Sequence, residues 1–238
     1  MKARCTFFGP RVVVACGVLV LAAPGAFAQR AGDTVVSAGA ALIMPDESLG
    51  RLNSVGPAAP AFNAATAGAT ASIDNVPTAT FSVLHMFTDN IAGEFTFGVP
   101  PKMKVDVQLA SGSHPDAASA RVLIPALLGK YVFRPPAEPL RPFVGLGVTR
   151  VSFTSVSANR SDPLINQLAG TSSSLSAKWA PVFAAGAIYN FNDRWSITGS
   201  LSYVPVKTEA TFVGSGTTTK GTLRLNPTDL IVRVGYRF

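Results

Sequence analysis

The residues with the greatest potential for catalysis in this 238-residue chain are its two histidines. A serine hydrolase needs a histidine that is oriented by a carboxylate. His85 shares one face of an alternating segment with Phe81 and Phe87, so we expect it in an aromatic belt rather than in an active site. His114 follows a serine and precedes a proline in a polar segment, and we expect a solvated loop residue there. The sequence therefore predicts no catalytic residue and no enzyme.

The sequence contains no pattern that is typical of a metal, cofactor or nucleic-acid site. No cluster of histidine, cysteine or carboxylate residues has metal-ligand spacing. No glycine-rich phosphate loop follows a predicted strand, and no run of basic residues alternates with aromatic ones. We predict no metal, no cofactor and no nucleic-acid partner.

Four charged residues lie within apolar, alternating segments: Glu94, Lys130, Asp229 and Arg233. An unpaired charge inside a protein is costly. One interpretation is that these side chains pair with one another and plug an interior. The other is that they line a path for a ligand or an ion, and the choice depends on the elements that carry them.

The composition indicates that these elements lie in a membrane. Hydrophobic residues make up 47% of the chain and charged residues only 14%, against about 25% charged residues in a typical soluble domain. No internal run approaches the roughly 20 apolar residues that a spanning helix needs. Because only helices and closed barrels satisfy every backbone group in lipid, this composition favours a β-barrel.

Hydrophobic and small or polar residues alternate with a period of two. In the last segment, Leu230, Val232 and Val234 share one face of a strand, and Asp229 and Arg233 share the other. The same pattern predicts eight strands, near 33–44, 73–87, 91–105, 118–134, 141–155, 175–191, 194–212 and 221–238.

Short and long connections alternate strictly between the eight strands. Tight polar turns are expected at 88–90 and 192–193, and a stiff proline-rich turn at 134–140. The connections at 45–72, 106–117, 156–174 and 213–220 are longer. The predicted fold is all-β, an eight-stranded antiparallel transmembrane β-barrel with short periplasmic turns and longer extracellular loops.

The N-terminal segment has the features of an export signal. Lys2, Arg4 and Arg11 precede an apolar stretch, and Ala26-Phe27-Ala28 is a suitable cleavage site before Gln29. We predict a signal peptide at 1–28 and an outer-membrane β-barrel at 29–238. Cleavage would remove both cysteines and lower the formal charge from +7 to +4.

The two faces of the predicted strands have different compositions. Aromatic residues on the outer face are interpreted as lipid-facing girdles, and the outer-membrane lipids are the predicted partners of Phe95, Phe97, Tyr131, Phe133, Trp195, Tyr203, Tyr236 and Phe238. The chain ends on an aromatic strand, a feature that predicts recognition by the barrel-assembly machinery. The candidates for lining the lumen are Glu94, Thr96, Lys130, Ser196, Thr198, Ser200, Ser202, Asp229 and Arg233.

Several stretches, in order along the chain, resemble the OmpW family of small outer-membrane barrels. They are Phe87-Thr88-Asp89-Asn90-Ile91-Ala92-Gly93-Glu94, Leu123-Ile124-Pro125-Ala126-Leu127, Lys130-Tyr131-Val132-Phe133, Arg141-Pro142-Phe143-Val144-Gly145-Leu146-Gly147-Val148, Leu225-Asn226-Pro227 and Gly235-Tyr236-Arg237-Phe238. The resemblance implies an eight-stranded barrel in the outer membrane of a Gram-negative bacterium. It also implies passive passage or binding of small hydrophobic solutes.

Two functions remain open at this stage. The first is porin-like, with passive transport or binding of small hydrophobic or amphipathic molecules. The alternative is a plugged, non-conducting structural or receptor barrel that acts through its extracellular loops, since an eight-stranded interior is barely wider than its side chains. The first long loop, Pro45 to Ala71, is expected to be a disordered surface loop or a lid over the lumen.

Overall fold

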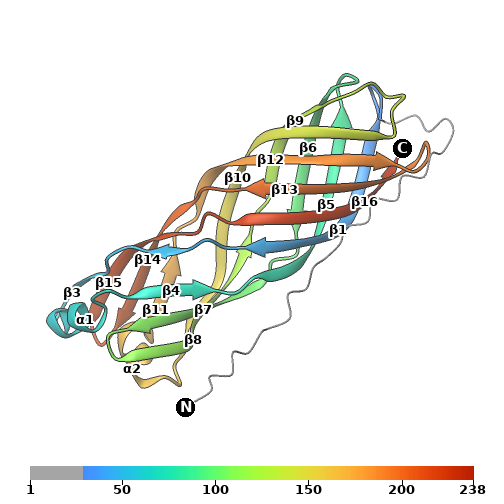
Figure 1. The fold of residues 1–238 in the computed structure, drawn as a ribbon. Helices are drawn as coiled ribbons and strands as arrows, with labels where there is room; N and C mark the ends of the chain where they lie inside the picture. Colours follow the sequence, from blue (N-terminus) through green and yellow to red (C-terminus); the bar gives the residue numbers. More distant parts are fainter. Residues whose placement is uncertain (1–28) are drawn as a thin grey trace, which may run out of the picture.

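Eight antiparallel strands close on one another to form a barrel (Figure 1). The structure is a computed structural model that describes residues 29–238; the predicted signal peptide at 1–28 lies outside the described residues. The closing contacts join the first strand to the last and the fifth to the sixth. In order around the barrel, the strands are β1 (Thr34–Met44), β5 (Val76–Met86), β6 (Ile91–Gly98), β9 (Ala126–Val132), β10 (Leu140–Ala158), β12 (Lys178–Asn190), β13 (Trp195–Tyr203) and β16 (Thr228–Arg237).

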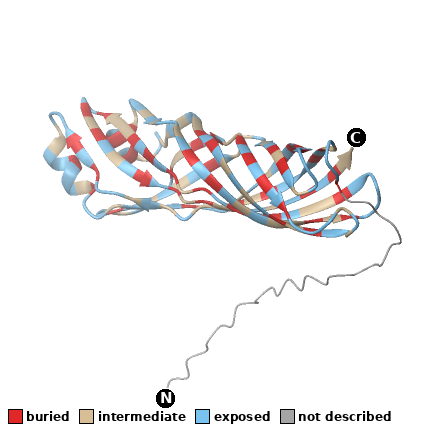
Figure 2. Ribbon diagram, turned by 90° about the horizontal axis from the view of Figure 1, so that it is seen from above, coloured by how far each residue is buried: buried red, intermediate tan, exposed pale blue. Residues whose placement is uncertain are grey.

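The period-two pattern places one face of each strand inside the barrel (Figure 2). Strand β9 illustrates it: Leu128 and Lys130 are buried, whereas Leu127 and Tyr131 are exposed. The exposed residues of the barrel wall are largely apolar, as lipid contact requires. Within residues 29–238, no helix is long and apolar enough to cross a membrane.

Short turns and both ends of the described chain lie at one end of the barrel. The hydroxyl of Thr88 accepts hydrogen bonds from the backbone N–H groups of Asn90 and Ile91, which fixes the β5–β6 turn. The side-chain oxygen of Asn192 does the same for Arg194 and Trp195 in the β12–β13 turn. This is the periplasmic end, and the short turns predicted there are confirmed.

The four longer connections lie at the other end of the barrel, as predicted, but they contain strands and two short helices in place of irregular loops. They build an outer extension of two small sheets on the barrel (Figure 1). One sheet joins β4, β7 and β8 to the outer half of β10; the other joins β11, β14 and β15 with β2 and β3. The elements are β2 (Ser48–Leu49), β3 (Asn53–Val55), α1 (Ala59–Ala65), β4 (Thr70–Ile73), β7 (Lys102–Leu109), β8 (Gly112–Leu123), α2 (Pro163–Ala169), β11 (Ser172–Leu175), β14 (Lys207–Gly214) and β15 (Thr217–Arg224).

The first long connection shows why disorder was the wrong expectation there. Strands β2 and β3 pair with β15, so their backbone groups are satisfied by a neighbouring strand. Helix α1 buries Phe62 in an apolar cluster with Leu109 and Leu168. This burial offsets the entropy of ordering a segment rich in glycine, alanine and proline.

Candidate functional site

Three buried charges form a cluster that crosses the interior of the barrel. The Lys130 ammonium lies 2.5 Å from one carboxylate oxygen of Glu94, and a guanidinium nitrogen of Arg233 lies 3.0 Å from the other. All three side chains are at most 5% exposed. Strand β16 is not adjacent to β6, so Arg233 must reach across the lumen. It also donates to the Thr96 hydroxyl at 2.8 Å.

The Lys130 ammonium has a second contact. It lies 4.0 Å from the centre of the Phe143 ring, a cation–π arrangement that gains strength where water is excluded. Each charged group of the cluster therefore has an oppositely charged partner, and the lysine also has an aromatic one. The cluster has the arrangement of a plug rather than of an open ion path.

The remaining lumen candidates lie on the inner face as well, and Thr198 is directly opposite Arg233 of the cluster. The side-chain Oγ of Ser202 donates to one oxygen of Asp229 at 3.2 Å, and the other carboxylate oxygen of Asp229 is buried without a hydrogen-bond partner within the described residues. Asp229 therefore does not join the ion cluster. Buried Ser196 and Ser200, and half-buried Thr198, alternate with Ser202 along β13.

A second plug closes the periplasmic end, and the sequence reasoning missed it. Arg141 is completely buried, and its guanidinium donates only to backbone carbonyls. The acceptors are the carbonyl oxygens of Gln29 at 2.7 Å, of Arg134 at 2.9 Å, of Phe133 at 3.4 Å and of Asp89. The period-two alternation could have indicated this position. Arg141 is two residues before Phe143, so both side chains lie on the same, inner face of the strand.

Two cavities lie on the outer side of the molecule, and the ion cluster forms part of the lining of the inner one. The inner cavity has a volume of about 90 Å³, with Glu94, Lys130, Arg233 and Asp229 among its polar lining residues. The outer cavity, about 110 Å³, lies in the extension. Its lining is dominated by apolar side chains, which include Leu109, Ala117, Ile165, Leu168 and Phe212.

A continuous apolar cluster connects the two cavities. It contains Val122, which lines the inner cavity, and Leu223, which lines the outer one. Val105 packs against this cluster and lines the outer cavity as well. The surroundings between the outer cavity and the apolar side of the inner one are therefore hydrocarbon-like.

The barrel wall is interrupted beside the inner cavity. Strands β6 and β9 pair as far as Thr96 and Ala126, and the register resumes between β7 and β8 at Lys102 and Arg121. Between these points residues 97–101 and 122–125 are spanned by a backbone hydrogen bond at the outer edge, from the Val122 N–H to the Pro101 carbonyl at 3.3 Å, and they include three prolines, which lack a backbone donor. Several of them line the inner cavity from both sides of the interruption, among them Phe97, Val99, Pro101, Val122 and Ile124.

His114 is not a solvated loop residue, which corrects the expectation for it. Its Nδ1 lies 2.6 Å from a carboxylate oxygen of Asp162, and its Nε2 lies 3.1 Å from the Ser111 hydroxyl. The order of residues resembles that of a serine hydrolase, but Ser111 is exposed in a hairpin turn and none of the three lines either cavity. The contact is best described as a structural link between the β7–β8 hairpin and α2.

The same carboxylate caps helix α2. Asp162 accepts hydrogen bonds from the backbone N–H groups of Leu164 and Ile165. The hydrogen bond from His114, followed by that from Ile165, holds the pKa of the Asp162 carboxyl below its ordinary value. The ionised carboxylate is therefore the form that stabilises this junction.

We expect Asp162→Ala to loosen α2 by about 0.5–2 kcal/mol, the usual cost of losing an N-terminal cap. Because the pKa of the carboxyl is lowered in the folded state, its contribution is present above the ordinary pKa of about 3.9 and is lost as the pH falls through the lowered value. Hydrogen exchange of the α2 amides measures both effects. Asp162→Asn retains a capping group and should preserve most of the protection at neutral pH; equal loss in both variants would contradict this account.

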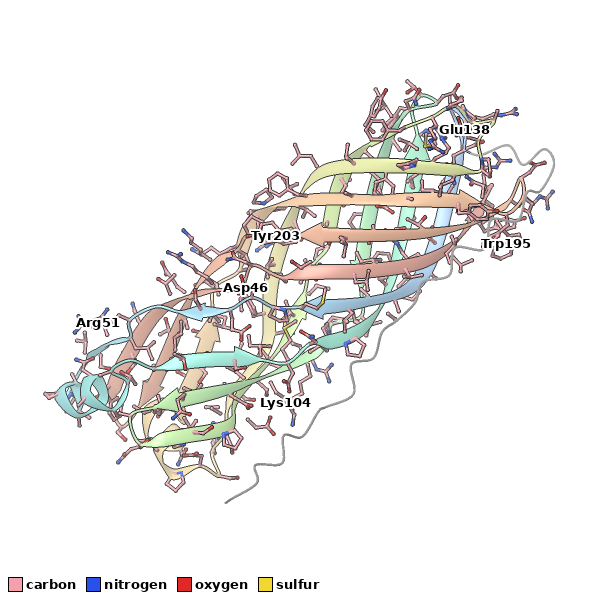
Figure 3. All side chains as sticks on the ribbon, in the orientation of Figure 1. Asp46, Arg51, Lys104, Glu138, Trp195 and Tyr203 are labelled. Atoms are coloured by element: carbon pink, nitrogen blue, oxygen red, sulfur yellow. The ribbon has the colours of Figure 1, made fainter. Side chains whose placement is uncertain are left out.

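The outward aromatic residues lie at two levels of the wall. Trp195 begins β13 and Tyr203 ends it, as Figure 3 shows. The eight residue steps between them rise about 20 Å along the barrel axis on a strand tilted by about 40°, which fits within an outer-membrane apolar band about 25 Å tall. Exposed aromatic residues at or near the periplasmic end are Phe87, Tyr131, Phe133, Phe191, Trp195 and Phe238, and those farther out are Phe81, Phe95, Phe97, Trp179, Phe183 and Tyr203. Tyr236 is half-buried and packs edge-on against Trp195.

His85 lies on the same outward face. It is exposed, its ring packs edge-on against Phe87, and its Nδ1 lies 2.9 Å from the Thr34 hydroxyl.

Both the wall composition and the closed interior are those of a small outer-membrane β-barrel protein. That class is defined by the fold and by this site together.

The sequence profile of the OmpW family matches residues 30–238, and the chain belongs to this family. It is similar to outer membrane protein W of Escherichia coli strain K12, with 29% identity over 95% of this chain and 98% of the relative. It is also similar to outer membrane protein AlkL of Ectopseudomonas oleovorans, with 31% identity over 76% and 71% of the two chains. The crystal structure of OprG from Pseudomonas aeruginosa matches with a TM-score of 0.78 at 22% identity, covering 90% of this chain and 99% of that one. The protein is thus an outer-membrane β-barrel of a Gram-negative bacterium.

Proposed function

We propose that the protein binds small hydrophobic and amphipathic molecules at its outer extension and passes them into the membrane. The observation that carries this proposal is the apolar outer cavity, joined by a continuous apolar cluster to the inner one. Apolar cavities of roughly 150 Å³ in proteins stay dry and bind molecules such as benzene. A cavity of about 110 Å³ is of similar scale.

The interruption of the barrel wall supports a route from the inner cavity to the lipid. Below that cavity the ion cluster, an apolar cluster that includes Met86 and Phe143, and Arg141 occupy the lumen in the periplasmic direction. Beside it, Phe97 and Val99 line the cavity and are also exposed on the lipid-facing side. A solute that leaves through residues 97–101 and 122–125 would avoid both water and the buried charges.

Asp229 supports the inclusion of amphipathic solutes. Its unpartnered carboxylate oxygen lies beside apolar Ile231 in the lining of the inner cavity. A hydroxyl or amine on a solute would satisfy that oxygen while its hydrocarbon part contacts the apolar wall. Leaving such a buried acceptor unsatisfied costs about 1–3 kcal/mol, which a suitable head group would recover.

The alternative, a plugged barrel that acts through its extracellular part, shares the closed lumen with this proposal. The two differ in the outer cavity, which a purely structural or receptor barrel would not need. Recognition of the aromatic C-terminal strand by the barrel-assembly machinery is compatible with both.

We expect Ala117→Phe, which fills the outer cavity, to reduce the affinity for an apolar fluorescent probe about tenfold, a loss of ~1.4 kcal/mol. Ala117 is buried against that cavity. The measurement is titration of N-phenyl-1-naphthylamine into the folded protein, with heat-modifiable gel mobility as the test of folding. The matched control is Ala185→Phe on the lipid-facing side of β12. Unchanged affinity in folded Ala117→Phe would refute the proposed cavity site.

A further inference from the structure

Basic residues oppose one another across two hairpins where the strands leave the barrel. Lys102 lies directly opposite Arg121 on β7 and β8, and Lys207 lies directly opposite Arg224 on β14 and β15. Directly opposed side chains in an antiparallel pair have Cβ atoms about 5 Å apart, so like charges there repel. An anionic group bound between the two cations of each pair would offset this repulsion.

The positions of these four residues follow a common rule. Lys102 and Lys207 each come four residues after the end of a barrel strand, at Gly98 and Tyr203. Arg224 comes four residues before the start of β16, and Arg121 comes five residues before the start of β9. All four side chains are exposed.

A fifth cation, Arg150, completes this set, which we name the basic collar: Lys102, Arg121, Arg150, Lys207 and Arg224. Its guanidinium lies 6.0 Å from the centre of the Trp179 ring, an exposed aromatic. Within residues 29–238, no carboxylate lies within ion-pairing distance of any collar residue. Lys104, in the same sheet, differs because it pairs with Asp116 at 2.7 Å.

The collar lies a few residues beyond the outer aromatic level of the wall, within reach of the lipid head groups for long side chains. Four residues beyond Tyr203 correspond to about 13 Å along a tilted strand, and head groups extend roughly 5–8 Å beyond the hydrocarbon on each side of a bilayer. Long lysine and arginine side chains reach back over the difference. Carboxylates lie beside the collar, but among the residues that the structure describes they form no ion pair with it. Glu209 is exposed two residues after Lys207 on β14, and Glu47 precedes Ser48, which pairs with Arg224; Glu47 accepts a hydrogen bond from the Ile73 N–H instead.

We propose that the basic collar binds the phosphate groups of the phosphorylated glycolipid, lipid A, in the outer leaflet. A phosphate between two opposed cations replaces their repulsion with two charge-assisted hydrogen bonds. Arginine adds bidentate geometry that suits phosphate oxygens. The collar would orient the barrel in the leaflet and hold lipid beside the interruption in the wall, because Lys102 and Arg121 adjoin it.

The test compares two double variants of the folded protein in nanodiscs. Lys207→Gln with Arg224→Gln removes one collar pair. Arg51→Gln with Lys220→Gln removes two exposed cations nearer the tip of the extension, where Figure 3 places Arg51. The probes are bisphosphorylated lipid A and its dephosphorylated form, and binding is measured by native mass spectrometry. Heat-modifiable mobility verifies folding, and Lys102→Gln with Arg121→Gln repeats the test on the other hairpin.

We expect the collar variants to lose about tenfold in affinity for bisphosphorylated lipid A, with the tip variant unchanged. Equal losses in both kinds of variant would overturn the proposal, as would a wild-type protein that does not prefer the phosphorylated lipid. Inorganic phosphate should not compete at millimolar concentration. Competition at that level would assign the collar to free anions instead of lipid.

Discussion

Glu94→Gln is expected to destabilise the folded barrel by about 3–5 kcal/mol, because it leaves two buried cations without their counter-charge. Lys130 and Arg233 both bind this one carboxylate, and neither can reach water without reopening the lumen. The measurement is urea unfolding in lipid vesicles, followed by tryptophan fluorescence.

The chain supplies a matched control for this prediction. Glu138→Gln removes the same charge from an exposed pair with Arg134, and its cost should not exceed about 1 kcal/mol. The double variant Glu94→Gln with Lys130→Met should recover part of the loss, because it removes one of the orphaned cations as well. A single Glu94→Gln variant as stable as the wild type would show that the cluster is not a closed ion network.

Arg141→Met should cost at least about 3 kcal/mol, through the loss of several hydrogen bonds from one charged group. The substitution leaves the carbonyl oxygens of Gln29, Asp89 and Arg134 without their donor at the periplasmic end. The same unfolding assay measures the effect.

Arg141→Lys tests the geometry of this plug. A lysine retains the charge but lacks the planar fork that reaches several carbonyls at once, so most of the loss should remain. Arg134→Met, at an exposed position in the same turn, is the control. Full rescue by lysine would mean that charge alone, and not the fork, closes this end.

The barrel could be predicted because its signal is local. Alternation within single segments placed Leu128 and Lys130 on the inner face and Tyr131 on the outer one without any knowledge of the neighbouring strands. The parity of short and long connections then fixed the number of strands.

The outer extension could not be predicted in the same way. Residues 106–117 are polar and contain glycine and proline, so they have the composition of a loop. They form a hairpin because the outer half of β10 offers an edge with which β8 pairs. The regular structure of this hairpin therefore depends on β10, which lies some 35 residues away in the chain.

Contacts across the interior were also beyond sequence reasoning. The sequence indicated Glu94, Lys130, Asp229 and Arg233 as possible partners. The stagger of the strands decides that three of them meet while Asp229 stays apart. The His114–Asp162 contact joins residues 48 positions apart through the packing of the β7–β8 hairpin beside α2, which no local pattern reports.

The most direct test of the proposed function is uptake of N-phenyl-1-naphthylamine by vesicles that contain the folded protein, with potassium leak from the same vesicles as the internal reference. The lumen is closed, and the apolar cavity lies beside an interrupted wall. We therefore expect the protein to speed uptake of the probe relative to empty vesicles without increasing the potassium leak. Probe uptake that rises only together with ion leak would contradict the account, because the solute would then be using an open lumen.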